Sequence, residues 1–245
     1  MAQFSTLLPL KITSALVGRT RYKKSTDDTR YNKDGQATLS FAIMQGNLPF
    51  VQNLLRQPHV DINGGSPKYQ PPILVALEYQ QYDILKMLLQ DSRIDIDVQN
   101  GQGHTALHLA IIYDDLVALQ MLLDHTHIDI NYLDSSGNSA LLLAAMTYDG
   151  RNPKRETIID VLVSHPKASV DIQDHRGRSV LWHAANTSNR RLILQLAWLS
   201  ATNLEAPDDN GVTPLGQARK RGDLEIAALL QNLVILTEAF RCSLI

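Results

Sequence analysis

Histidine is the residue type in this sequence with the most direct route to chemistry, because a neutral imidazole binds zinc. His125 and His127 are separated by a single residue, and His59 and His165 lie in comparable stretches. However, His59 and His127 both stand two residues before an Asp-Ile-Asn sequence, so one position recurs along the chain. A recurring surface position explains these histidines better than a metal centre does. We therefore expect no metal and no cofactor.

The chain contains none of the short motifs that mark common catalytic sites. It has no Gly-x-Gly-x-x-Gly nucleotide loop, no Walker sequence and no Gly-x-Ser-x-Gly nucleophile turn. Each of these chemistries needs its residues at a fixed spacing, and that spacing does not occur. We therefore expect a protein that is not an enzyme.

The single cysteine, Cys242, stands fourth from the end in Cys-Ser-Leu-Ile, with aliphatic Leu244 and terminal Ile245. This order resembles a Cys-a-a-X prenylation signal, and the bulky aliphatic end favours a geranylgeranyl group. Lipidation at Cys242 would bring the protein to a membrane surface. The alternative is a cysteine that packs on the last helix or lies in solvent, since one prenyl chain without a basic cluster anchors weakly.

The residues that would have to position any site belong to a repeated unit. The octet Gly-His-Thr-Ala-Leu-His-Leu-Ala at residues 103–110 returns in imperfect copies, whose final alanines are spaced by 34, 34, 34, 40 and 34 residues. An apolar pair twelve residues later, Leu122-Leu123 in the best copy, keeps the same phase. Self-similarity at this period indicates an array of stacked units. The marker alanines are Ala42, Ala76, Ala110, Ala144, Ala184 and Ala218.

Each unit carries the signals of a turn followed by two helices. Thr105 and Thr213 are suited to cap a helix, because a hydroxyl accepts a hydrogen bond from a free amide of the first turn. Pro72 and Pro214 are suited to the first helical position, and the second apolar run again has helical spacing. A glycine upstream of most caps supplies a left-handed turn residue. These glycines are Gly35, Gly103, Gly137, Gly177 and Gly211.

A 34-residue unit with Thr-Ala-Leu-His-Leu-Ala, a Leu-Leu pair and the connector Asp129-Ile130-Asn131 resembles an ankyrin repeat. The resemblance covers residues 32–235 and implies an all-α solenoid of about six stacked helix-turn-helix units with hairpin tips. The sequence departs from the family pattern at Tyr69, where the turn glycine is missing, and at Trp182, where the best copy has His108. The resemblance implies that His108 stabilises its turn.

Three segments follow from the repeat register. Residues 1–31 precede the array, and their apolar residues are expected to cap its first unit, because a solenoid needs protected ends. Residues 32–235 form the array itself. Residues 236–245 form the end of the last helix and the cysteine tail. An apolar stripe at helical spacing on that helix should close the other end of the stack. It consists of Leu224, Ile226, Leu229, Leu230, Leu233, Thr237 and Phe240.

The 40-residue interval marks an insertion in the fourth unit, at residues 148–156. It contains Asp-Gly and Asn-Pro, which mark turns, so the extra residues should lengthen the loop between two helices. Insertions in repeat arrays often lie on the binding face. A six-residue insertion is also thermodynamically cheap, so it need have no function.

The composition indicates a water-soluble array. The chain has 245 residues, 44% hydrophobic residues and a formal charge of −2, which argues against a nucleic-acid partner. A single cysteine excludes a disulfide framework and favours a reducing, cytoplasmic compartment. No apolar run has the length of a membrane span. We expect a monomer.

Charge is unevenly distributed along the array. Residues 32–134 hold five basic and twelve acidic residues, whereas residues 135–222 hold eleven basic and eight acidic residues. Such a charge gradient could orient an encounter with a partner. The plainer interpretation is that these charges are the solvated faces of a solenoid.

The resemblance places partner contacts on the turn tips and on exposed positions of the first helix of each unit, along a concave surface. Tyr79 and Tyr113 hold the same register with apolar residues beside them, which is typical of a binding hot spot. Partial burial of these side chains against neighbouring repeats is the alternative. The predicted partner-binding residues are Met44, Tyr79, Ile112, Tyr113, Met146, His104, Arg176, Arg178, Lys220 and Arg221.

These observations favour a non-enzymatic adaptor that binds another protein and is tethered to a membrane through Cys242. Two alternatives stay open: a soluble ankyrin inhibitor or scaffold without lipidation, and an accessory module that presents substrate to a catalytic partner. The connector Asp-Ile-Asn with its preceding histidines also resembles arrays in effectors that intracellular bacteria place in host cells. Prenylation would then depend on host enzymes.

Overall fold

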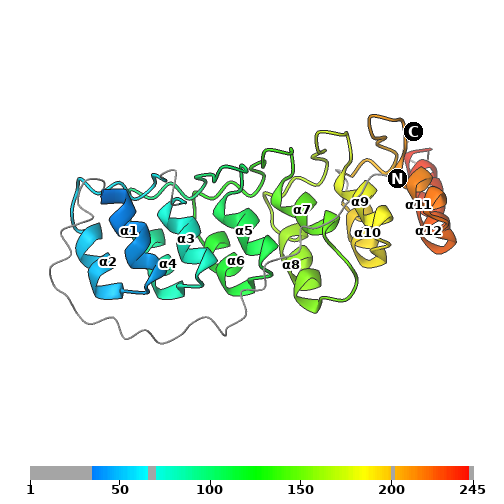
Figure 1. Cartoon of the computed structure of the whole chain (residues 1–245). Helices are drawn as coiled ribbons and strands as arrows, with labels where there is room; N and C mark the ends of the chain where they lie inside the picture. Colours follow the sequence, from blue (N-terminus) through cyan, green and yellow to red (C-terminus); the bar gives the residue numbers. More distant parts are fainter. Residues whose placement is uncertain (1–34, 66–69, 200–201, 243–245) are drawn as a thin grey trace.

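The computed structural model describes residues 35–65, 70–199 and 202–242, and within them the chain forms six pairs of helices (Figure 1). These ranges contain no β-strand, only an isolated antiparallel bridge between Gln173 and Ser179. The predicted all-α solenoid is confirmed. Residues 1–31 lie outside the described ranges, so their capping role stays a prediction. The helices are α1 (Gly35–Met44), α2 (Leu48–Leu55), α3 (Pro72–Glu78), α4 (Tyr82–Gln90), α5 (Ala106–Ile112), α6 (Leu116–Leu123), α7 (Ala140–Met146), α8 (Pro153–Val163), α9 (Val180–Asn186), α10 (Arg190–Ala197), α11 (Pro214–Arg221) and α12 (Leu224–Cys242).

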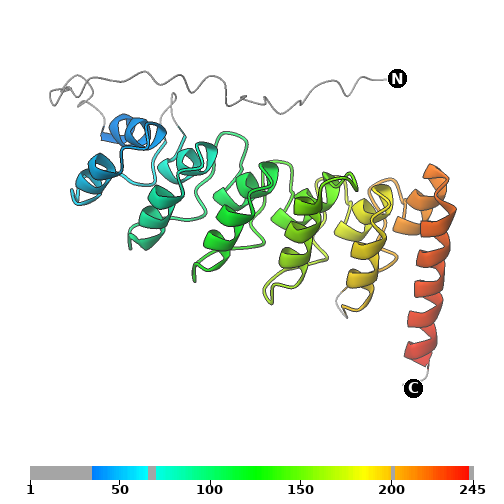
Figure 2. The same ribbon diagram turned by 90° about the horizontal axis from the view of Figure 1, so that it is seen from below.

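The pairs stack side by side into an elongated array of two layers (Figures 1 and 2). The first helices pack in the order α1, α3, α5, α7, α9 and α11, and the second helices pack in the order α2, α4, α6, α8, α10 and α12. The connections between pairs protrude along one side, at the top of Figure 1. Each helix therefore contacts its own partner and the equivalent helices of the units next to it.

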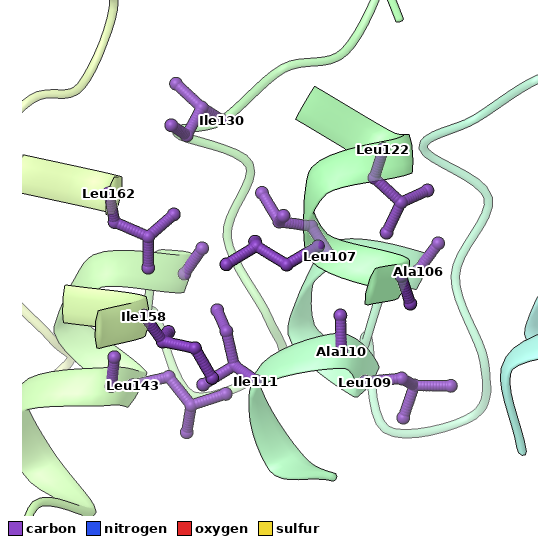
Figure 3. Packing of buried hydrophobic residues seen from close by; sticks show 14 of the residues in the cluster. Ala106, Leu107, Leu109, Ala110, Ile111, Leu122, Ile130, Leu143, Ile158 and Leu162 are labelled. Atoms are coloured by element: carbon purple, nitrogen blue, oxygen red, sulfur yellow. The ribbon is translucent and has the colours of Figure 1, made fainter. Parts of the chain in front are cut away.

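The first helices are the most buried part of the array. α3, α5, α7 and α9 have seven residues each, and the first six residues of each are buried. Ala110 and Leu122 are completely buried, as the register predicts. In Figure 3, Leu107 and Ile111 of α5 lie between their own helix pair, α5 and α6, and the side chains of Ile158 and Leu162 in the next unit. A continuous core thus runs through the whole array.

Side-chain caps fix where α7, α9 and α11 begin, whereas Pro71 at the N-cap of α3 makes no side-chain hydrogen bond. Thr213 accepts a hydrogen bond from the Gly216 amide at 3.1 Å, and Ser139 and Ser179 play the same role for α7 and α9. Pro72 and Pro214 stand in the first turn of α3 and α11, as predicted. The serines at two caps do what threonine does elsewhere, because only the hydroxyl oxygen is needed.

An Asn or Asp residue organises each hairpin tip. The Oδ1 atom of Asp134 accepts hydrogen bonds from the amides of Ser136 and Asn138, both at 2.8 Å, so one carboxylate closes the tip from two sides. Neighbouring tips are also joined, since the Ser135 amide donates to the Gln102 carbonyl at 3.3 Å. The tips therefore form a continuous strip. Asn100, Asp174 and Asp208 accept the corresponding amides in the other described tips.

Glycine is needed at these tips for two reasons. Gly103 and Gly137 have φ values of +75° and +79°, in the left-handed region that glycine tolerates best. A Cβ on Gly103 would also lie 2.5 Å from the backbone nitrogen of Ser135 in the next tip. Gly177 and Gly211 adopt the same conformation. The expectation of a turn at Gly35 was wrong, because α1 begins at that residue.

The insertion lengthens a helix as well as a loop. The connection from α7 to α8 spans residues 147–152, three more than the connection from α5 to α6, and α8 has 11 residues where α6 has eight. Asn152 caps α8 and also donates from Nδ2 to Asp114 Oδ2 at 2.7 Å. The buried Arg155 places Nε 2.9 Å from Asp114 Oδ1. The insertion is therefore attached to the preceding unit.

The last helix, α12, is 19 residues long and extends past the other second helices (Figure 2). Ile226 and Leu230 are buried against the array, as predicted, but Leu224 is 79% exposed. Leu224 begins the helix on the side away from the core, so the apolar stripe that closes the stack starts at Ile226.

The N-caps of the second helices yield a stability prediction. Asn47 and Asn189 cap α2 and α10 through their side chains. The φ and ψ angles are −81° and 75° for Asn47, and −81° and 79° for Asn189. Gln81 has nearly the same angles, −85° and 71°, yet its longer side chain makes no cap hydrogen bond. Gln81→Asn should therefore raise the free energy of unfolding by about 1 kcal/mol.

Urea unfolding followed by circular dichroism would measure this change. Asn189→Ala is the matched control, because it removes an existing cap and should cost about 1 kcal/mol. An unfolding midpoint for Gln81→Asn equal to or below that of the parent protein would contradict the prediction.

Candidate functional site

The exposed positions of the first helices lie at their C-terminal ends. Because the first six residues of α3, α5, α7 and α9 are buried, only the second and third residues after the marker alanine reach the surface in these units. We call these two positions of every unit the helix-end row. It consists of Met44 and Gln45, Glu78 and Tyr79, Ile112 and Tyr113, Met146 and Thr147, Asn186 and Thr187, and Lys220 and Arg221.

The helix-end row is apolar and aromatic over the first four units. Tyr79, Ile112 and Tyr113 are 43%, 39% and 44% exposed, and Met44 and Met146 are half-buried beside them. Tyr79 and Tyr113 occupy the C-caps of α3 and α5 with similar backbone angles, −96° and 7°, and −90° and 0°. Five of the predicted binding residues therefore lie in the first four units of the helix-end row, and Lys220 and Arg221 lie at its other end.

One carboxylate lies within this apolar stretch. Burial raises the pKa of Glu78 above its usual value, although the residue keeps an exposed side chain. Burial, and after it the charge of Glu78, also raises the pKa of both Tyr79 and Tyr113. Gln70 donates a hydrogen bond to the Oε2 atom of Glu78 at 3.2 Å.

The basic end of the helix-end row is separate from the aromatic end. Lys220 and Arg221 are exposed at the end of α11. Asn186 of α9 lies between them and Met146 in the row, and its Oδ1 accepts a hydrogen bond from Gln217 at 2.7 Å. A partner would have to span a polar unit to touch both ends.

The predicted tip residues form a second row, at the opposite end of the first helices. A helix of seven residues is about 10 Å long, so the two rows are about that far apart. His104 is half-buried, with Nε2 3.7 Å from Asp134 Oδ2. Arg178 donates from Nε to Asp174 Oδ2 at 2.7 Å and lies 5.4 Å from the Trp182 ring centroid. Arg176, the third predicted tip residue, is exposed, whereas His104 and Arg178 are half-buried.

The histidine of the best repeat links two units. His108 is fully buried, with Nδ1 2.9 Å from Thr105 Oγ1 and Nε2 3.0 Å from the carbonyl oxygen of Asn138 in the next tip. Its counterpart Trp182 cannot copy this contact, and its indole nitrogen is buried with no hydrogen-bond partner in the structure. His183 instead places Nε2 3.3 Å from Asp174 Oδ2 in its own tip.

Trp198, which is not among the predicted binding residues, is 88% exposed. It lines a surface hollow of about 500 Å³ on α10, together with Arg190, Arg191, Leu194 and Gln195. Trp198 is the C-cap of α10, a position that Arg56, Asp124 and Ser164 occupy in other units. A tryptophan in an otherwise polar register was the signal that could have revealed it.

The histidines that suggested zinc lie on the connectors. The rings of His125 and His127 are 5.8 Å apart and edge-to-face. Within the parts of the chain that the structure describes, no group of three or more histidine, cysteine, aspartate or glutamate side chains is placed to hold a metal ion. Cys242 ends α12, and residues 243–245 lie outside the described ranges.

Residues 73–174 match the family model for ankyrin repeats, in three copies. The chain contains ankyrin repeats. The same register continues through the units on either side of these three, so the helix pairs outside the matched residues repeat the same arrangement.

Comparisons with known proteins agree on the fold. The ankyrin repeat domain of Bcl-3, described as a unique member of the IkappaB protein family, has a TM-score of 0.70 and 25% identity, covering 82% of this chain and 87% of that chain. An ankyrin repeat domain from Acinetobacter baumannii AYE has a TM-score of 0.64 and 24% identity, covering 80% and 97%. The ankyrin repeat protein L271 of Acanthamoeba polyphaga mimivirus is 35% identical over 82 residues, which is 34% of this chain. The match spans only 11% of the viral protein.

Buried histidines make the stability of the array depend on pH. Burial, and after it the charge of Arg178, lowers the pKa of His183 from 6.5 to about 4 despite the nearby Asp174. Between these values the unfolded chain binds a proton that the folded chain does not, so stability falls as the pH falls from 6.5 to 4. His183 should account for a loss of up to about 3 kcal/mol.

His183→Gln should therefore lose less stability than the parent protein over this range. Urea unfolding at pH 7.0, 5.5 and 4.5 would measure the difference. Burial also lowers the pKa of His108, so the variant should keep part of the pH dependence. Parallel curves of unfolding free energy against pH for the two proteins would contradict a role for His183.

Proposed function

We propose that this chain is a non-enzymatic adaptor that binds another protein through the helix-end row. Ankyrin repeats generally mediate protein–protein interaction and are typically not catalytic. The observation that carries the proposal is the exposure of Tyr79, Ile112 and Tyr113 side by side in two adjacent units. Aromatic residues that are anchored on a rigid scaffold lose little conformational freedom on binding, which suits them to an interface.

Tip residues play a smaller part in the proposed interface. His104 and Arg178 already contact Asp134 and Asp174, so a partner would have to compete with these interactions. Arg176, Lys220 and Arg221 are exposed and remain proposed contacts. The aromatic end of the row should therefore provide most of the binding energy, and the basic residues should mainly orient the partner.

Replacement of the two tyrosines tests the site. Tyr79→Ala and Tyr113→Ala should each weaken partner binding by about 2 kcal/mol, because each removes a large exposed contact surface. Helical circular dichroism should stay nearly unchanged, since both side chains stand outside the core.

The measurement is affinity capture from a cell lysate, followed by titration of the captured protein. Tyr132→Ala is the matched control, because Tyr132 is 37% exposed but lies on a connector away from the row. An unchanged affinity in both tyrosine variants would exclude the helix-end row as the binding site.

We also propose that prenylation of Cys242 tethers the adaptor to a membrane surface in the cytoplasm. None of the described helices is long and apolar enough to cross a membrane. The support for tethering is the sequence Cys242-Ser243-Leu244-Ile245 at the end of α12. Prenylation joins the thiol to an isoprenoid through a thioether, after which the last three residues are removed.

Intact-mass measurement after expression in a eukaryotic cytosol tests this proposal. The chain should gain one isoprenoid, lose Ser243-Leu244-Ile245 and shift partly into the membrane fraction. Cys242→Ser should stay unmodified and soluble, because it lacks the nucleophile. One lipid chain binds only weakly, so fractionation should respond to salt if basic residues add to it. An unmodified mass with Ile245 present would contradict prenylation of Cys242, and the soluble inhibitor or scaffold would then be the proposed function.

A third candidate function is an accessory module that presents substrate to a catalytic partner. Such a module would bind through the same helix-end row, and it would differ from the adaptor only in that the protein it binds is an enzyme. The proposal of an effector acting inside a host cell rests on the Asp-Ile-Asn connectors and their histidines. Identification of the captured protein would decide between these candidates.

A further inference from the structure

Three residues of two adjacent units occupy neighbouring positions of the helix-end row. Glu78 ends α3, Tyr79 caps it, and Tyr113 caps α5. Each tyrosine amide donates to the carbonyl four residues earlier, both at 3.0 Å, so the two rings start from equivalent, fixed backbone positions. Neighbouring helices pack about 8–10 Å apart, and this sets the separation of the two positions.

Glu78 is a carboxylate in an unfavourable place. The six residues before it in α3 are buried and apolar, so the side chain begins at the edge of the core. In the described ranges the side chain of Glu78 accepts a hydrogen bond from the neutral amide of Gln70. Within the described ranges, neither lysine nor arginine forms an ion pair with Glu78. A carboxylate at the edge of an apolar surface with no cation beside it would gain from a cation that a ligand supplies.

The two rings complement such a ligand. Tyr79 and Tyr113 occupy equivalent cap positions of adjacent units, and an aromatic face attracts a cation within roughly 6 Å of the ring centre. The charge of the surrounding units agrees, since residues 32–134 hold twelve acidic and only five basic residues. A basic partner segment would be attracted to this end of the array.

We propose that Glu78, Tyr79 and Tyr113 form a cradle for an arginine side chain of the partner protein. The guanidinium group is planar and weakly hydrated, so it can stack on the rings while it donates hydrogen bonds to the carboxylate. This inference rests on the proposed function of the helix-end row and names the chemistry that the row recognises. Ile112 and the two methionines would then contact apolar residues that flank the arginine.

Two peptide pools test the cradle. Both contain nine-residue peptides that are degenerate at every flanking position, and the central residue is arginine in one and citrulline, its neutral isostere, in the other. Immobilised wild-type protein should retain the arginine pool on the order of tenfold better than the citrulline pool, the gain expected for a charge pair with two aromatic contacts. Glu78→Gln should reduce this ratio to near one, and Tyr79→Leu and Tyr113→Leu should each lower it.

Glu205→Gln is the matched control, because Glu205 is exposed on a connector and should leave the ratio unchanged. Circular dichroism and thermal unfolding should be the same for all variants. If the wild-type protein fails to prefer the arginine pool, or if Glu78→Gln keeps the preference, the cradle is wrong.

The same measurement separates the cradle from the binding row. If the wild-type protein retains both pools equally and Tyr79→Ala and Tyr113→Ala retain neither, the cradle is wrong but the row is still supported as a binding site. Equal retention that survives both substitutions would remove the cradle and the proposed function together.

Discussion

Burial of the first helices between their neighbours is the constraint on which this structure depends. A helix of seven residues is too short to be stable in water by itself, because its nucleation cost exceeds what a few internal hydrogen bonds return. α5 is helical because six of its seven residues are buried against α3, α6 and α7. Stability is therefore shared between neighbouring units, and each unit depends on the interfaces on its two sides.

This constraint also determines where a partner can bind. Since the first six residues of α3 and α5 are buried by packing, only the last helical residue and the C-cap residue can contact a partner and determine specificity. The equivalent positions of the repeat vary from Glu78-Tyr79 to Lys220-Arg221 along the array, whereas the buried positions are mostly apolar, with His108 and His183 as exceptions. The array thus separates its folding residues from its recognition residues within each helix.

The polar side chains that join neighbouring units differ in how many of their hydrogen-bonding groups have a partner. His108 uses both ring nitrogens, one within its own turn and one on the next tip. At the equivalent place Trp182 leaves its N–H without a partner in the structure and contributes packing and an Arg178 contact instead. The insertion adds the buried Arg155 next to Asp114, a link whose loss would leave a charge without compensation. These links make the interfaces between units unequal.

The sequence by itself determined the repeat period, the order of the helices, the caps at Thr213 and Pro214, and the burial of Ala110 and Leu122. All of these depend on contacts that are local or that recur at a fixed register, which one chain displays without its coordinates. It also identified Tyr79 and Tyr113 as a pair, because equivalent positions of adjacent units lie side by side. The exposure of both side chains agrees with this choice, and their role in binding is a proposal.

Only the tertiary structure decided which polar side chains are free and how irregular segments are arranged. His104 and Arg178 look available in the sequence, but their neighbours Asp134 and Asp174 already contact them. The division of the insertion between loop and helix depends on the contact of Arg155 with Asp114, 41 positions earlier in the chain. Contacts of this kind follow from the distance between side chains in space, which no pattern along one sequence records.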